Sequence, residues 1–73
     1  MRDFSEVLRE LRAEKKVSQK ALGEVLGVSD RNIRSYETGE YRPDFEGLLI
    51  PADYFQVSLD YLVGRSEERK SQP

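Results

Sequence analysis

The 73-residue sequence contains no cysteine, no histidine and no tryptophan, and only one methionine. Without cysteine there is no disulfide framework and no thiolate ligand, and without histidine there is no imidazole for catalysis or zinc binding. No apolar run approaches the ~20 residues of a membrane-spanning helix, and no charged-then-apolar signal segment follows Met1. The sequence therefore predicts a small cytoplasmic protein that is not an enzyme and has no cofactor, no metal and no membrane partner.

The net charge of −2 is unusual for a nucleic-acid-binding protein, because the domains that bind nucleic acids are commonly basic. The charge is unevenly divided, however. Residues 1–42 contain nine basic and eight acidic side chains, a net charge of +1. Residues 43–73 contain three basic and six acidic side chains, a net charge of −3. Affinity for phosphate depends on the local charge of one face. Any basic surface must therefore lie in the first two-thirds of the chain.

The apolar residues recur with a helical period, as in Phe4, Val7, Leu8 and Leu11, which follow the i, i+3, i+4, i+7 pattern. This periodicity predicts an all-α fold, a compact bundle of five short helices. The helices are expected over residues 3–15, 19–26, 30–38, 44–55 and 59–63. The apolar residues expected to form the core are Phe4, Val7, Leu8, Leu11, Leu22, Val25, Leu26, Phe45, Leu48, Leu49, Ala52, Phe55, Leu59, Leu62 and Val63.

Polar caps and glycines mark the ends of these helices. Ser18, Ser29 and Ser58 each precede a helical segment, where a serine side chain can accept a hydrogen bond from a free backbone N–H. Gly27 and Gly39 follow helical segments, as residues in the left-handed region commonly do. We expect one domain over residues 3–65, followed by a polar tail over residues 66–73 that is disordered.

Residues 18–37 form the most informative segment. Two capped helices are joined by the short link of residues 27–29, and Gly23 lies inside the first of them. Glycine within a helix costs roughly 0.5–1 kcal/mol relative to alanine, so its presence indicates that another helix approaches closely. These features are typical of a helix-turn-helix, in which the second helix presents its outer face to the major groove of DNA.

The second of these helices has one polar and one apolar side. At about 100° per residue, Asp30, Arg31, Arg34 and Ser35 share the polar side, whereas Ile33 and Tyr36 lie opposite. An exposed polar helix face is ordinary in a soluble protein and by itself indicates only a solvated surface. The turn that precedes this face is what favours a role in DNA binding.

The segment resembles a known family through glycines, caps and apolar positions that agree together. The residues that carry the likeness are Ser18-Gln19-x-x-Leu22-Gly23-x-x-Leu26-Gly27-Val28-Ser29-x-x-x-Ile33-x-x-Tyr36-Glu37-x-Gly39. The likeness continues through Arg42-Pro43 and ends with Val57-Ser58-Leu59-Asp60-Tyr61-Leu62-Val63-Gly64-Arg65. This pattern is similar to the XRE family, the lambda-repressor-like or Cro-CI-type helix-turn-helix, over about residues 4–65. The motif itself covers about residues 18–37, with a recognition helix at about residues 30–38.

The resemblance implies which side chains read bases. The first, second and sixth positions of the recognition helix are Asp30, Arg31 and Ser35, and Arg34 shares their face. Arg31 is the strongest candidate, because a guanidinium can donate two hydrogen bonds to guanine O6 and N7, worth about 1–3 kcal/mol of discrimination. Asp30 has two interpretations, acceptance from a cytosine amino group or stabilisation of the helix N-terminus.

The resemblance also implies which residues contact the DNA backbone and which residues hold the helices of the motif in place. The backbone candidates are Ser18, Gln19, Lys20, Asn32, Tyr41 and Arg42. For Lys20 and Arg42 a role in solubility alone remains an alternative. The structural set is Arg12, Glu37, Gly23 and Gly27, in which Arg12 and Glu37 are expected to form an ion pair that holds the recognition helix.

The fourth helix departs from the family pattern at two positions. Pro51 stands where the family normally has a large aliphatic residue, and Ile50 stands where a polar residue is common. Proline inside a helix removes a hydrogen bond and clashes with the carbonyl four residues earlier, here that of Gly47. We therefore expect a bent or broken helix and an apolar surface around Leu49, Ile50 and Tyr54. That surface would be either a dimer contact or a repacked core.

Two functions from different classes follow from these residues. The leading one is a transcriptional regulator, most simply a repressor of bacterial or phage type, that binds double-stranded DNA at an inverted repeat as a homodimer. The alternative is an antitoxin or anti-repressor-type module that uses the same fold to bind another protein. The acidic net charge and the Ile50 surface favour this alternative.

Overall fold

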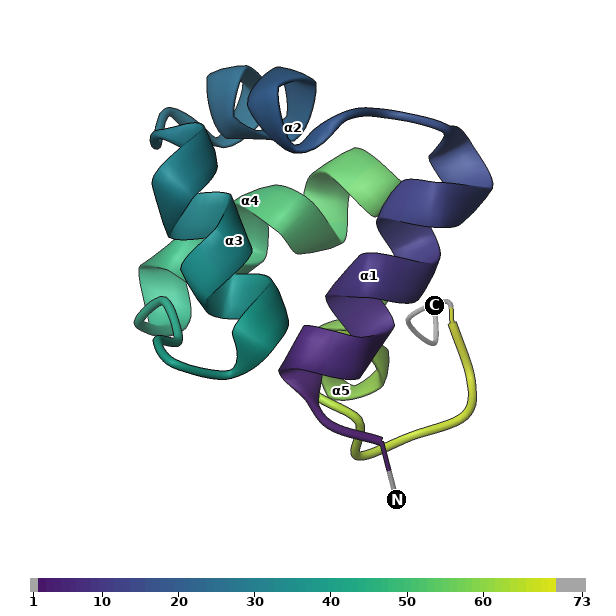
Figure 1. The fold of residues 1–73 in the computed structure, drawn as a ribbon. Coiled ribbons are helices and arrows are strands. Elements are labelled where there is room, and N and C mark those ends of the chain that lie inside the picture. The colour runs from purple at the N-terminus through teal and green to yellow at the C-terminus, as the bar shows by residue number, and fades with distance from the viewer. Residues whose placement is uncertain (1, 70–73) are drawn as a thin grey trace.

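In the computed structural model, which describes residues 2–69, every regular element is a helix, as the all-α prediction requires (Figure 1). None of these helices is long and apolar enough to span a membrane. The five helices are α1 (Phe4–Lys15), α2 (Gln19–Leu26), α3 (Asp30–Thr38), α4 (Phe45–Phe55) and α5 (Leu59–Leu62).

Side-chain caps begin all five helices. The cap residues are Asp3, Ser18, Ser29, Asp44 and Ser58. The three serine caps confirm the predicted helix starts, whereas Asp3 and Asp44, predicted to be first helical residues, are the caps themselves. The Ser5 hydroxyl and the Glu6 N–H both donate to the Asp3 carboxylate and hold its pKa below the usual range. At the other ends, Gly27 and Gly39 have φ values of 74° and 85°, as their positions predicted.

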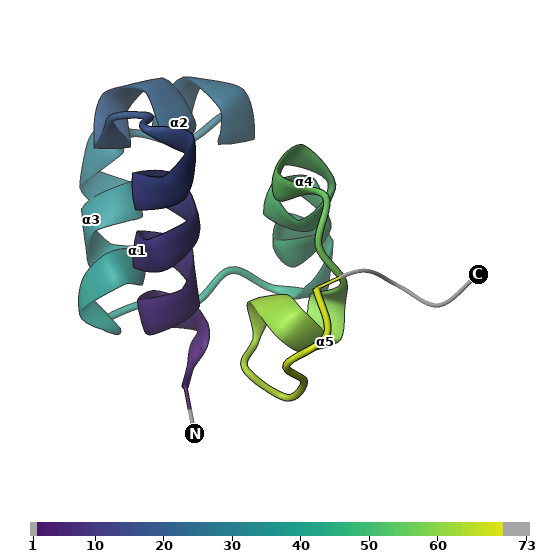
Figure 2. The same ribbon diagram turned by 90° about the vertical axis from the view of Figure 1, so that its right-hand side faces the viewer.

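The helices form two parts around one core. Figure 2 shows α1 beside α3 with α2 across one end of the pair. Helices α4 and α5 form the second part, at the right of this view. Contacts of α1 with α3 and α5, and of α2 with α3 and α4, bring the apolar faces of these helices together. The buried apolar residues are Phe4, Val7, Leu8, Leu11, Leu22, Ile33, Ala52, Tyr61 and Leu62. Tyr61 belongs to this core, although the sequence analysis did not single it out.

Three residues predicted to lie in the core are exposed instead. Val25 is 44%, Phe45 65% and Leu49 39% exposed to solvent. Helical periodicity identifies apolar residues that share a face, but it does not say how wide a strip the neighbouring helices cover. The apolar arc of α4 is wider than the strip in contact with the core, so its edges remain in water.

Pro51 does not break α4, so that part of the prediction is wrong. The helix runs without interruption from Phe45 to Phe55 with Pro51 inside it. The proline ring is fully buried and fills a core position. Gly47, whose carbonyl faces the Pro51 ring, is also in close contact with the preceding loop. A Cβ at this position would lie 2.8 Å from the Cβ of Pro43. Burial of the ring thus offsets part of the cost of the missing N–H.

Arg69, within the predicted tail, contacts the domain. Arg69 donates two hydrogen bonds to the Glu14 carboxylate, at 2.8 and 2.6 Å, and a third to the Tyr61 hydroxyl at 3.1 Å. The guanidinium of Arg69 holds the pKa of Glu14 below its usual range. Arg2 also lies 5.2 Å from the centre of the Tyr61 ring, as Arg69 does. Residues 70–73 of that tail lie outside the described residues.

A side chain at position 23 should destabilise the domain, because the helix-turn-helix packs backbone against backbone there. A Cβ on Gly23 would lie 2.7 Å from the Val28 carbonyl oxygen, which belongs to the rigid turn. Gly23→Ala should therefore lower the free energy of unfolding by about 1–3 kcal/mol in urea titrations, in spite of the better helix propensity of alanine. The control Glu24→Ala, at the exposed neighbour, should stay within about 0.5 kcal/mol of the wild type. An unchanged or raised urea midpoint for Gly23→Ala would show that the turn can move to make room for the Cβ, and would contradict this prediction.

Candidate nucleic-acid interface

The turn between α2 and α3 is held by backbone contacts. The Val28 N–H donates to the Gly23 carbonyl at 2.9 Å, and Gly27 adopts the left-handed conformation that reverses the chain. The Ser29 hydroxyl then accepts from the Asn32 N–H at 3.1 Å and begins α3. These contacts fix the angle between the helices, and with it the direction in which α3 presents its outer side.

The outer side of α3 carries the predicted base-reading residues. Asp30, Arg31 and Arg34 are exposed, and Ser35 is half-buried. Ile33, on the opposite side, is fully buried in the core. Arg31, Arg34 and Ser35 also line one shallow groove together with Asn32, Thr38, Glu40 and Tyr41. The structure thus brings three of the four predicted base-reading residues into one groove, with Asp30 on the same helix at its N-terminus.

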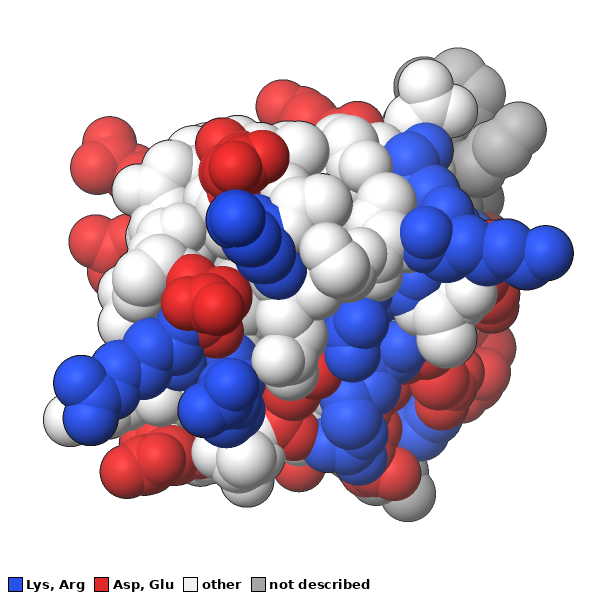
Figure 3. Space-filling view, turned by 45° about the horizontal axis from the view of Figure 1, so that its top comes forward, with Lys and Arg blue, Asp and Glu red and all other residues white. Residues whose placement is uncertain are grey.

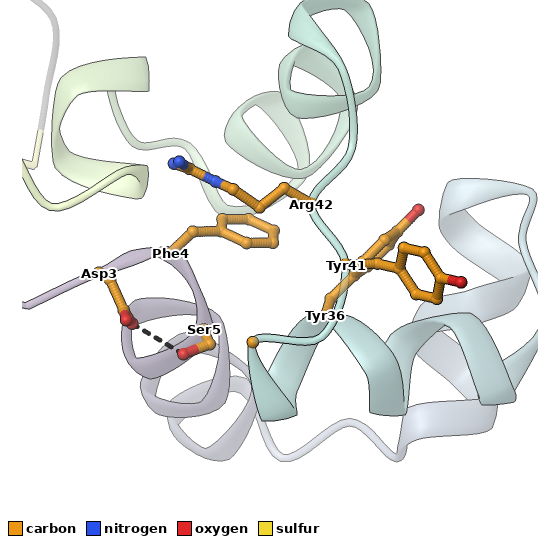
Figure 4. Close-up of a pocket in the computed structure, with 7 residues that line it drawn as sticks. Asp3, Phe4, Ser5, Tyr36, Tyr41 and Arg42 are labelled. Carbon is orange, nitrogen blue, oxygen red and sulfur yellow. Dashed lines mark hydrogen bonds between the residues drawn. The ribbon is translucent and has the colours of Figure 1, made fainter.

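A second set of predicted residues gathers where the loop after α3 leaves the helix. Asn32, Tyr41 and Arg42 line a hollow beside the first groove, together with Tyr36, which was not among the predicted site residues. A neighbouring hollow, shown in Figure 4, reaches from Tyr41 and Arg42 to Phe4 at the start of α1. Tyr41 is 64% exposed and lines all three depressions. Asn32, Tyr41 and Arg42, predicted to contact the DNA backbone, therefore flank the base-reading residues.

The charge on this surface is mixed rather than uniformly basic. Figure 3 shows Lys and Arg side chains interspersed with Asp and Glu. Asp30 adjoins Arg31 in α3, and Glu40 lies in the same groove as Arg34. A surface of this kind gives a smaller non-specific attraction to phosphate than a continuous basic patch would. The exposed arginines Arg31 and Arg34 are therefore separate positive charges rather than parts of one continuous basic patch.

The start of α2 holds the remaining predicted backbone contacts, and two of them already have partners. The Ser18 hydroxyl accepts from the Ala21 N–H at 3.0 Å as the helix cap. The Gln19 side-chain amide donates to Glu37 Oε1 at 3.0 Å. Lys20 is exposed. Gln19 thus couples the N-terminus of α2 to the end of α3, a link that the sequence analysis did not anticipate.

Glu37 is the centre of a hydrogen-bonded network inside the domain. Its side chain is only 5% exposed, and its two oxygens accept from Arg12 Nε at 2.6 Å and from Arg12 Nη2 at 3.1 Å. Arg12 also donates to the Val17 carbonyl at 3.1 Å. The expected pair of Arg12 and Glu37 is therefore present, with both oxygens engaged. It attaches the last turn of α3 to α1.

Arg9 is a member of this network that the sequence analysis missed. Its guanidinium donates to the backbone carbonyl of Glu37 near the end of α3, where helix carbonyls lack intrahelical partners. The signal in the sequence is the spacing, because residues three apart lie on the same helix face. Arg9 and Arg12 therefore hold the end of α3 from the same side of α1.

Comparison with known proteins places these features in a family. A helix-turn-helix family model matches residues 8–62. Among curated proteins, the chain is 37% identical over 67 residues to YqaE, an uncharacterised HTH-type transcriptional regulator of Bacillus subtilis, covering 90% of this chain and 58% of that protein. It is 40% identical over 60 residues to repressor protein C2 of Salmonella phage P22, covering 82% of this chain and 28% of the repressor. The chain thus spans less than two-thirds of the length of these relatives.

Solved structures share the fold as well as the sequence. The P22 c2 repressor in complex with the synthetic operator 9T superposes with a TM-score of 0.83 at 35% identity, over 90% of this chain and all of that chain. A transcriptional regulator from Listeria innocua has a TM-score of 0.82 at 36% identity, over 94% of this chain and 64% of its own. These similarities identify the arrangement of α2 and α3 as a lambda-repressor-like helix-turn-helix.

The Glu37 network predicts a specific pattern of stabilities. Arg12→Met leaves a buried carboxylate without its main partner and should cost about 3–5 kcal/mol of unfolding free energy. The double variant Arg12→Met/Glu37→Met should be more stable than Arg12→Met alone, because no unpaired buried charge remains. Urea titrations of both single variants and the double variant measure this coupling.

The matched control is the exposed pair of Arg65 and Asp60, whose side chains are 76% and 64% exposed. Arg65→Met should cost less than about 1 kcal/mol. Strictly additive losses for Arg12 and Glu37 would mean that the pair does not act as a unit.

Proposed function

The chain belongs to the XRE-type helix-turn-helix family, and from that membership we propose that it is a DNA-binding transcriptional regulator. Its family and relatives are transcriptional regulators and not enzymes. The observation that carries the proposal is the outer side of α3, where Arg31 and Arg34 are exposed on a helix whose opposite side is buried. A repressor of bacterial or phage type is the form that the P22 relative favours.

Base reading is assigned to α3 in the major groove. Arg31 lies in the first turn of the helix, free to extend two parallel N–H donors toward guanine O6 and N7. Arg34, one turn further, reaches either a base or the adjacent phosphate. Asp30 accepts from a cytosine amino group or stabilises the helix N-terminus, and Ser35 is short enough to act through a bridging water.

Positioning on the DNA backbone is assigned to groups on both sides of α3. Lys20 and the free N–H groups at the start of α2 offer a phosphate site on one side, with Ser18 and Gln19. Asn32, Tyr41 and Arg42 offer donors on the other. Contacts of this kind fix the register of the protein without reading sequence. Gln19 has the added role of coupling a bound phosphate to Glu37.

The protein is proposed to bind an inverted repeat as a homodimer. One copy presents a single short recognition helix, which reads too few base pairs for useful genomic specificity. Two copies related by a two-fold axis would place their recognition helices about 34 Å apart, one turn of the duplex. We assign the contact between copies to the α5 end of the molecule, where Leu59 and Val63 are half-exposed.

The proposal is tested by selection from a pool of random duplex DNA, followed by binding of the selected sequence at about 50 and 200 mM salt. We expect an enriched palindromic motif and a loss of affinity of about 10³-fold or more between the two salt concentrations, because bound phosphates release counterions. The mass of the complex by sedimentation should correspond to two chains per duplex. Absence of any enriched motif would contradict the regulator proposal.

Two substitutions separate base reading from backbone contact. Arg31→Ala should relax the preference at one position of each half-site and cost about 1–3 kcal/mol on the selected sequence. Lys20→Ala should weaken binding to all sequences alike and reduce the salt slope by about 1. Lys15→Ala, which removes an exposed lysine from the last turn of α1, away from the groups assigned to DNA and to the contact between copies, is the control and should change neither. A uniform loss for Arg31→Ala would remove its assigned role.

A further inference from the structure

The outer face of α4 carries large apolar side chains in water. Phe45 is 65%, Leu49 39% and Ile50 46% exposed. Figure 2 shows α4 on the side of the molecule away from α1 and α3. The exposure of the three side chains shows that this face of α4 is in water. It plays no part in the grooves assigned to DNA, which are lined by α1, α3 and the loop after it.

Carboxylates lie among these apolar side chains. At about 100° per residue, Phe45 and Leu49 fall within about 40° of each other, Asp53 and Glu46 follow, and Ile50 lies about 40° beyond Glu46. The face therefore alternates apolar, acidic and apolar across its width. Helix α4 contains no lysine or arginine, and within residues 2–69 neither Glu46 nor Asp53 takes part in an ion pair.

A second copy of this chain does not suit this face. If two α4 helices packed antiparallel about a two-fold axis near Leu49 and Ile50, Glu46 of each copy would lie opposite Asp53 of the other. Four carboxylates would then share one contact, and burial of like charges opposes association. The alternative that α4 forms the dimer contact is therefore disfavoured by its own charges.

We propose that the outer face of α4 is a docking surface for a basic amphipathic helix of a different protein. Apolar residues of such a helix would cover Leu49 and Ile50, and its lysines or arginines would pair with Glu46 and Asp53. Helix α4 has 11 residues and is thus about 16 Å long, so the complementary segment is about three turns. This is an interaction beyond DNA binding, and it stands whether or not the chain proves to be a regulator.

The experiment uses two synthetic peptides of about 18 residues, one built of leucine and lysine and the other of leucine and glutamate in the same amphipathic pattern. Binding to the full chain is measured by fluorescence anisotropy and located by ¹⁵N chemical-shift changes. We expect the lysine peptide to bind, with shifts concentrated on α4, and the glutamate peptide not to bind. Ile50→Lys should weaken binding about tenfold or more, as loss of a central contact does.

Charge reversal provides the sharper test. Glu46→Lys/Asp53→Lys should exchange the preference, so that the glutamate peptide binds and the lysine peptide does not, an outcome that mere loss of structure cannot give. The controls are Val25→Lys, an aliphatic 44% exposed on α2, and Asp60→Lys on α5, neither of which should change peptide binding.

Three results would overturn the proposal. The first is binding of both peptides alike, and the second is a set of shifts centred on α3 rather than α4. The third is self-association of the chain that Ile50→Lys abolishes, which would assign the face to a second copy.

Discussion

The buried carboxylate of Glu37 is the interaction on which the rest of the structure depends. It lies at the end of α3 and is almost completely removed from water, so it must be paired or the helix cannot pack there. Arg12 in α1 donates two hydrogen bonds to this carboxylate, and Gln19 in α2 donates a third. Three helices are thus joined at one charged group. This arrangement fixes the C-terminal end of α3 relative to α1 and α2.

The other end of α3 is fixed by a different constraint, the absence of a side chain at Gly23. The turn of residues 27–29 packs its backbone so closely on α2 that a Cβ would meet the Val28 carbonyl. One end of α3 is thus held by the Glu37 hydrogen bonds and the other by close packing of the turn, and Arg31 and Arg34 lie between these two points. Their positions matter here because the surrounding charge is mixed and offers little general attraction for DNA. Geometry, more than net charge, has to supply affinity and specificity.

Helix α4 shows how one element can serve two environments. Its inner side fills the core with Pro51 and Ala52, and a proline ring is acceptable there because it is apolar and compact. Its outer side leaves Leu49 and Ile50 in water, with the carboxylates of Glu46 and Asp53 between them across the face. Stability alone would favour polar residues at exposed helix positions, so this pattern is most simply explained by binding.

The sequence by itself determined the helices, their caps and the helix-turn-helix, because these depend on local periodicity and on residues such as Ser29 and Gly27 that act within one turn. It also indicated that Arg12 and Glu37 would pair, through the resemblance to a family. Only the tertiary structure decided what lies between helices. It brought Gln19 and Arg9 to Glu37, left Phe45 and Leu49 in water, and kept α4 continuous through Pro51. These outcomes depend on contacts between residues distant in the chain, and no local pattern of spacing or propensity encodes how much of a helix its neighbours will cover.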